Sequence, residues 1–185
     1  MYRYAVPIVL ALLPIPALCA TVDLKDVSRT DRAILIVLPE EEKQNAPVRQ
    51  NPEDCGNERW LTRAGQAMAS ELADALRKNG FGKSTVYSSQ SCAAVEAAKL
   101  MNLKYKGALD FLNDVTSSVI NRARNKENLA FFLADRQGED TLIFVTHKGN
   151  VTDLSSLYLG YGDAISITVN LAKFEPVFEH QVRMK

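Results

Sequence analysis

Two uninterrupted apolar runs stand out in the hydrophobic pattern of the chain. Residues 33–38 and 141–146 are rich in β-branched side chains and show no alternation with polar residues. This pattern is typical of strands that are buried on both faces of a sheet. Shorter apolar segments at 84–87, 164–169 and 174–178 predict three further strands.

Apolar residues at helical spacing lie between these strands. Thr62 is a suitable N-cap and Gly80 a suitable end for a helix in which apolar residues recur every three to four positions. Weaker patterns predict a helix over 91–101, one capped by Asp114, and one around 129–133. A last helix is predicted from Val151 to Tyr158. The proposed inner faces are formed by Ala64, Met68, Leu72, Ala75 and Leu76; Ala94, Val95, Ala98 and Met101; Val115, Val119, Ile120 and Ala123; and Val151, Leu154, Leu157 and Tyr158.

The alternation of strands and helices predicts the fold class and the place of the site. We expect an α/β three-layer sandwich with a mainly parallel central sheet and helices on both faces. In such sheets, ligands bind beyond the carboxyl ends of the strands. Three predicted strand ends supply the candidate pocket residues, which are Leu38, Pro39, Glu40 and Glu41; Ser88, Ser89 and Ala93; and His147 and Lys148.

The N-terminal 20 residues have the pattern of a signal peptide. Arg3 precedes an apolar run that ends in prolines and in small residues near Ala20. The run is too short and too rich in proline to span a bilayer. We therefore expect cleavage after Ala20, a single exported domain over 21–185 and a periplasmic location. Lipid attachment at Cys19 is a less favoured alternative, because Leu18 is bulky for that processing site.

The charge balance bears on which partners the protein binds, and the cysteine content bears on its cellular compartment. The 185 residues include 22 basic and 22 acidic side chains, so no overall field favours nucleic acid. In an oxidising compartment, Cys55 and Cys92 form an expected disulfide that would contribute roughly 3 to 4 kcal/mol by loop closure. Two buried reduced thiols are the alternative, because spacing alone does not bring two cysteines to bonding distance.

Taken in order, the motifs resemble the histidine phosphatase superfamily, whose fold is called phosphoglycerate-mutase-like. The similarity extends over roughly residues 30–170, and small exported members such as lipopolysaccharide core heptose phosphatases have a similar length and layout. The motifs are the strand over 34–37; Leu61-Thr62-x-x-Gly65-Gln66-x-Met68-x-x-x-Leu72; Val86-Tyr87-Ser88-Ser89; Val145-Thr146-His147-Lys148-Gly149-Asn150; and Gly160-Tyr161-Gly162-Asp163.

The resemblance also implies a chemistry that this sequence does not retain. Family members use an Arg-His-Gly motif after the first strand, in which the histidine attacks phosphorus. They bind the phosphoryl oxygens with that arginine, a second arginine after the Ser-Ser pair, and a second histidine. These positions fall here on Leu38, Pro39, Glu40 and Ala93, and only the second histidine is kept, as His147. Phosphatase turnover by the family route is therefore expected to be lost.

Three functional hypotheses follow from these residues. The first is an exported pseudophosphatase that binds an unidentified protein or small molecule of the cell envelope and needs no cofactor. The second is an active hydrolase on an envelope phosphate, in which His147 beside Lys148 does the chemistry. The third is a metal site made of Glu40, Glu41, Glu42 and His147; a solvated acidic loop is the simpler interpretation, so we predict no metal.

Overall fold

The computed structural model describes residues 21–28, 31–41, 55, 60–114, 119–136 and 140–184. The predicted signal peptide, Cys19 and Glu42 lie outside the described residues. Within the described part of the chain, no helix is both long and apolar enough to cross a membrane.

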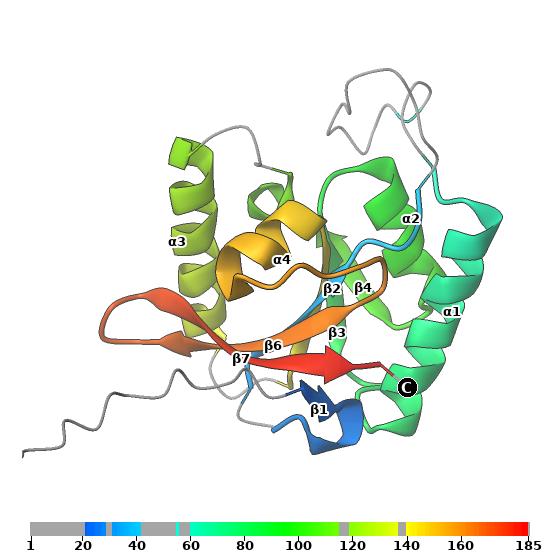
Figure 1. The fold of residues 1–185 in the computed structure, drawn as a ribbon, viewed down its shortest axis with the longest axis horizontal. Helices are drawn as coiled ribbons and strands as arrows, with labels where there is room; N and C mark the ends of the chain where they lie inside the picture. The colour runs from blue at the N-terminus through cyan, green and yellow to red at the C-terminus, as the bar shows by residue number, and fades with distance from the viewer. Residues whose placement is uncertain are drawn as a thin grey trace, which may run out of the picture.

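A seven-stranded sheet forms the middle layer, in the order β1-β7-β6-β2-β5-β3-β4 (Figure 1). Its centre is parallel, because β5 runs parallel to both β2 and β3, and β3 runs parallel to β4. Strand β6 is antiparallel to β2 and β7. The sheet is thus mainly parallel in the middle, as predicted. The strands are β1 (Thr21–Asp23), β2 (Ala33–Val37), β3 (Thr85–Ser88), β4 (Lys104–Ala108), β5 (Leu142–Thr146), β6 (Ala164–Asn170) and β7 (Glu175–Arg183).

Helices cover both faces of this sheet and give the predicted three layers (Figure 1). Helices α1 (Arg63–Lys78) and α2 (Cys92–Leu100) pack on one face, whereas α3 (Val119–Asp135) and α4 (Lys148–Ser155) pack on the other. Two short 3-10 helices complete the described elements: η1 (Leu24–Asp26) and η2 (Asp110–Leu112).

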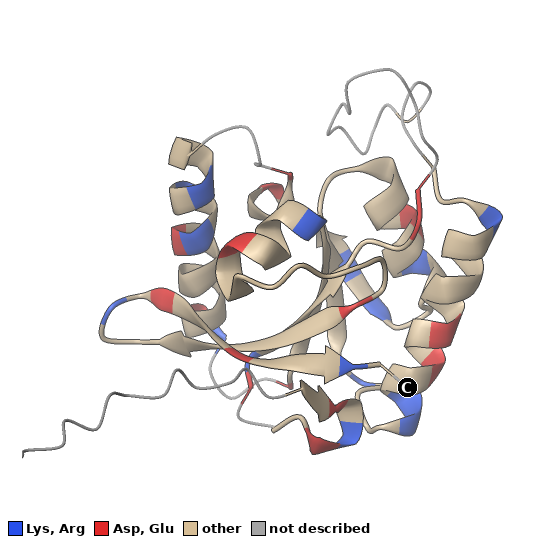
Figure 2. Cartoon of the chain, in the orientation of Figure 1, with Lys and Arg blue, Asp and Glu red and all other residues tan. Residues whose placement is uncertain are grey.

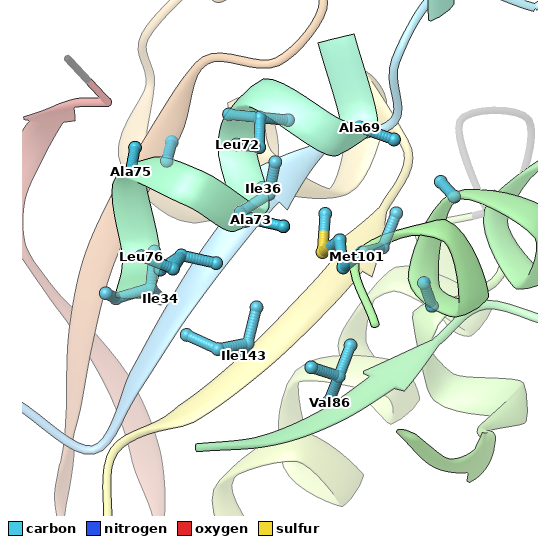
Figure 3. Packing of buried hydrophobic residues seen from close by; sticks show 14 of the residues in the cluster. Ile34, Ile36, Ala69, Leu72, Ala73, Ala75, Leu76, Val86, Met101 and Ile143 are labelled. Carbon is cyan, nitrogen blue, oxygen red and sulfur yellow. The ribbon is translucent and has the colours of Figure 1, made fainter. Parts of the chain in front are cut away.

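The core has two halves because the side chains of β2 alternate between the faces of the sheet. Ile34 and Ile36 pack against α1 and α2 (Figure 3), whereas Leu35 and Val37 face α3 and α4. All five residues of β2 are buried, as its uninterrupted apolar run predicts. Burying each large aliphatic side chain contributes about 1.5–3 kcal/mol, so this strand anchors the fold and fixes where its carboxyl end lies.

Helix α1 begins directly against the segment that follows β2. The Thr62 hydroxyl accepts a hydrogen bond from the Gly65 amide (3.0 Å) and donates one to the Glu40 carboxylate (2.9 Å). The Thr62 amide also donates to the Glu40 carbonyl oxygen (3.0 Å). Thr62 is therefore the N-cap that the sequence predicts, and it holds the chain after β2 in place.

The helical predictions for the second half of the chain need two corrections. The described part of the helix expected after Asp114 and the segment around 129–133 belong to one helix, α3 (Val119–Asp135). Val115 lies outside the described residues. Val119 and Ile120 are exposed rather than on an inner face. Helix α4 stops at Ser155, because Ser156 adopts a left-handed conformation (φ 59°). Tyr158 therefore lies beyond the helix and is 87% exposed.

The hydrophobic pattern does not predict the two edge strands, β1 and β4, and it predicts the end of β7 too early. Strand β4 carries Lys104 and Lys106 and lies at the edge of the sheet, so its exposed positions are charged rather than apolar. Strand β1 is only three residues long. Strand β7 runs to Arg183, well past the predicted end at residue 178.

Candidate functional site

The carboxyl ends of β2 and β5 meet at one edge of the sheet, where the sequence predicts a ligand site. Val37 is in register with Thr146, and the Leu38 amide donates to the Thr146 carbonyl oxygen at 2.8 Å. His147 follows directly and occupies the N-cap position of α4. The chain after β2 and the histidine after β5 are therefore neighbours in the fold.

His147 is buried, with 8% of its surface exposed, and its imidazole is held by hydroxyl groups after β3. Its Nε2 atom lies 3.0 Å from the Ser89 hydroxyl, which in turn lies 3.2 Å from the Ser91 hydroxyl. The Ser91 hydroxyl accepts a hydrogen bond from the Ala94 amide (3.3 Å) and caps α2. The orientation of the imidazole is thus set by the same residues that begin a helix.

Asn150, in the first turn of α4, connects the loops around this histidine. Its side-chain amide donates to the carbonyl oxygens of Leu112 and Asn113 and to the Thr146 hydroxyl, each at 2.9 Å. The Asn113 side chain is paired in turn with Gln90 (2.8 Å). These hydrogen bonds link the segments that follow β3, β4 and β5 to one another. These three segments form the floor of the site and hold it rigid.

A cleft of about 810 Å³ opens above this floor. Its size lies within the range of small-molecule sites. The described lining residues are Val37, Leu38, Glu41, Asp114, Arg122, His147, Lys148, Gly149, Thr152, Asp153, Ser156, Tyr158, Gly160 and Tyr161.

The charged side chains among the described lining residues of the cleft are of both signs. Glu41, Asp114 and Asp153 line it together with the cations Arg122 and Lys148. The Lys148 ammonium lies 3.6 Å from the centre of the Tyr158 ring, a cation–π contact. The Asp153 carboxylate is paired with Lys126 outside the lining, at 2.9 Å. A dianion such as a phosphate monoester would meet repulsion from carboxylates as well as attraction from two cations.

Only part of the candidate residue set lines this cleft. Leu38, Glu41, His147 and Lys148 do so. Ser89 is not a lining residue, but its hydroxyl contacts His147. Ser88 is buried, with its hydroxyl 3.2 Å from the Tyr105 hydroxyl.

The positions matched to the Arg-His-Gly motif and to the second arginine are occupied by residues with structural contacts. Pro39 is buried. Ala93 is 0% exposed and belongs to the apolar core between the sheet and the helices α1 and α2. The Glu40 carboxylate accepts the Thr62 hydroxyl, so it is engaged in holding α1.

Several lining residues come from helices distant in the sequence and were not predicted as a group. Arg122 comes from α3, Asp153 from α4 and Tyr161 from the turn before β6. Arg63, Arg122 and Arg124 are the arginines that the sequence offers as replacement cations for the pocket, without a motif that chooses among them; of these, Arg122 lines the cleft. In the part of the chain that the structure describes, no three ligating side chains are grouped to hold a metal ion.

A disulfide reaches the edge of the site. Cys55 and Cys92 are bonded, with their Cα atoms 5.8 Å apart, as predicted. Cys92 is the first residue of α2 and follows the Ser91 cap. The bond therefore fixes residue 55 beside the hydroxyl groups that hold His147.

Comparison with known proteins places the fold but not the activity. No protein-family model matches the sequence, and a search of curated proteins finds no significant match. Solved structures do match. A mutant phosphoserine phosphatase from Entamoeba histolytica in complex with phosphoserine aligns over 83% of this chain and 97% of its own (TM-score 0.59, 16% identity).

Two further structures show the same likeness. The protein histidine phosphatase SixA complexed with tungstate aligns over 82% of this chain and 96% of its own, with a TM-score of 0.58 and 13% identity. A mycobacterial glucosyl-3-phosphoglycerate phosphatase in complex with VO3 aligns over 79% and 95%, with a TM-score of 0.53 and 14% identity. The chain therefore has the histidine phosphatase fold, as the motif order predicts.

Proposed function

We propose that this chain is an exported binding module with the histidine phosphatase fold and without phosphatase chemistry. The observation that carries the proposal is the segment after β2. It brings Leu38 and the buried Pro39 to the place beside His147 where the resemblance would put an arginine and the nucleophile.

The chemistry of these side chains supports the proposal. A proline nitrogen within the chain has no lone pair for attack on phosphorus, and no rotamer change supplies one. Losing a covalent nucleophile costs on the order of a millionfold in kcat in a comparable hydrolase. At the second arginine position, Ala93 is packed in the core and offers no donor to an anion.

The ligand that fits this cleft best is a small molecule of mixed charge. Among the described lining residues, three carboxylates accompany two cations, with Asp153 paired to Lys126, and Tyr158 and Tyr161 are exposed. Aromatic rings at a rim provide stacking area, and the carboxylates favour a cationic or hydroxyl-rich group over a dianion. The expected partner is such a compound, or a protein segment that carries the same groups, in the cell envelope.

A phosphatase assay tests the proposal directly. The purified protein is assayed with p-nitrophenyl phosphate and phosphoserine, alongside His147→Ala and the surface variant Lys99→Gln as a matched control. We expect all three proteins to give the same rate as buffer. Turnover that His147→Ala abolishes and Lys99→Gln preserves would overturn the proposal.

A second candidate function is a hydrolase that uses His147. It is favoured by one observation: Arg122 and Lys148 line the cleft together with this histidine and could attract a phosphoryl group. A covalent phosphoryl adduct on His147, found by mass spectrometry after rapid quenching, would support this function. Absence of the adduct with substrates in excess would argue against it.

Export is tested separately. Expressed with its full N-terminus in a Gram-negative host, the protein is expected in the periplasmic fraction with Thr21 as its first residue. Retention of residues 1–20 in a cytoplasmic fraction would contradict this part of the proposal, and a lipid on Cys19 would favour the lipoprotein alternative.

A further inference from the structure

A second hollow lies toward the opposite end of the parallel strands and is strongly basic. It has a volume of about 480 Å³. Thr85 begins β3, Lys104 begins β4 and Asp140 precedes β5, so these residues mark the amino ends of the three strands. His147 follows the carboxyl end of β5, which makes this hollow separate from the cleft described above.

Cations from three elements converge on this hollow. Lys104 and Lys106 come from β4, Lys83 from the turn before β3, and Arg136 from the position after α3. Figure 2 shows basic residues in blue on β4. Asp140 is the one carboxylate among the described lining residues. Lysines on an edge strand are common because they prevent pairing with another sheet. That explanation does not account for Lys83 and Arg136, which belong to other elements.

Two hydrogen-bond donors of the hollow are held in place by packing. Tyr87 is 7% exposed, and its ring packs edge-on against Phe132, with the ring centres 5.1 Å apart. The Arg136 guanidinium lies 3.7 Å from the centre of the Phe132 ring. Its Nη1 atom donates to the Phe132 carbonyl oxygen (3.1 Å) and contacts the Asp135 carboxylate (3.4 Å). Both polar groups therefore lose little freedom when a ligand binds.

The donors that remain have no partner within the described parts of the chain. The Tyr87 hydroxyl makes no hydrogen bond there, in contrast to the Tyr105 hydroxyl, which pairs with Ser88. The three lysines form no ion pair there either. The Tyr87 hydroxyl is not one of the buried polar atoms that lack a partner, so it is open to solvent and available to donate a hydrogen bond to a ligand in the hollow.

We propose that this hollow is a binding site for a phosphate- or sulfate-type anion, carried by a small soluble molecule. Among the described lining residues, four cations stand against Asp140, and Arg136 also contacts Asp135, so this part of the hollow carries the positive charge that such an anion requires. Phosphate oxygens accept hydrogen bonds from lysine, guanidinium and hydroxyl groups. The hollow is larger than one phosphate group and has room for a diphosphate or a phosphorylated sugar.

Calorimetric titration with inorganic pyrophosphate at low ionic strength tests the site. Lys104→Gln combined with Lys106→Gln is expected to weaken binding about 100-fold, and Tyr87→Phe about tenfold, because each removes charge-assisted hydrogen bonds but keeps the packing. Lys78→Gln combined with Lys99→Gln removes the same charge from exposed positions on α1 and α2 and is expected to change the affinity less than twofold. Equal loss in both double variants would overturn the proposal.

The remaining outcomes separate this site from its alternatives. If Lys148→Gln abolishes pyrophosphate binding, the anion occupies the cleft of His147, and the proposal is wrong. Vesicles of phosphatidylglycerol, compared with phosphatidylcholine, provide a second arm. Binding to the anionic vesicles alone, lost in the Lys104 and Lys106 variant, would identify a lipid headgroup instead of a soluble ligand as the source of the anion. No binding of either probe overturns the proposal.

Discussion

Replacing Gly65 with alanine tests how closely α1 is pressed against the segment that follows β2. Helix propensity alone predicts a gain, since alanine is favoured over glycine by up to about 1 kcal/mol within a helix. The structure predicts the opposite. A Cβ atom at this position would lie inside van der Waals contact of the Glu40 carbonyl oxygen, 3.0 Å from its carbon and 3.2 Å from the Glu40 nitrogen.

The magnitude follows from what has to move. The nearest atoms are backbone, so the start of the helix or the Glu40 segment must shift. Overpacking of this kind costs about 1–3 kcal/mol. The shift also strains the Thr62 hydrogen bonds to Glu40, and losing a cap costs about 1 kcal/mol. Set against the propensity gain, the net expectation is a destabilisation of about 1–3 kcal/mol.

Urea unfolding followed by circular dichroism measures this difference. With a slope near 2 kcal/mol/M, the midpoint of Gly65→Ala should fall by about 0.5–1.5 M. Gly82→Ala is the matched control, since its nearest neighbour would be the Arg77 Cγ atom at 3.5 Å, an ordinary contact; it should change stability by less than about 0.5 kcal/mol. An unchanged or higher midpoint for Gly65→Ala would show that the close approach does not exist.

Three other predictions concern the site and its surroundings. Reducing the Cys55–Cys92 bond, which closes a loop of 37 residues, should lower the free energy of unfolding by about 4 kcal/mol in urea titrations with and without reductant; a Cys55→Ala/Cys92→Ala variant should not respond to reductant. Ser89→Ala should destabilise the fold by about 1–3 kcal/mol, because it leaves the buried His147 Nε2 without its hydroxyl partner, and a thermal shift below 1 °C would contradict this. Asn150→Ala removes three partly buried hydrogen bonds and should cost about 2–4 kcal/mol by the same measurement, whereas the exposed variant Lys99→Gln should not.

The fold could be predicted from the sequence where local signals and tertiary packing agree. The two buried strands, the Thr62 cap and the order of motifs each reflect one dominant requirement, such as burial on both faces or a partner for a helix amide. Strand β4 could not be predicted this way, because at the edge of a sheet the charges of Lys104 and Lys106 are favoured and hide the apolar alternation.

The sequence predicts the site residues that lie at strand ends, but not those that come from helices. The meeting of the chain after β2 with His147 follows from parallel pairing. Arg122 and Asp153 reach the same cleft from two helices whose positions depend on packing against the sheet, and no local pattern carries that information. The exposed start of α3, where Val119 and Ile120 mimic an inner face, shows the reverse case of an apolar pattern with no described core beneath it.

The order of the strands has a consequence for the biogenesis of this protein. Strand β2 appears early in the chain, yet its two neighbours are β5 and β6, which are synthesised more than 100 residues later. A nascent or truncated polypeptide that stops before residue 142 leaves this hydrophobic segment without either neighbour. Assembly must therefore wait for the last third of the chain, which slows folding and leaves residues 33–37 available to chaperones until then.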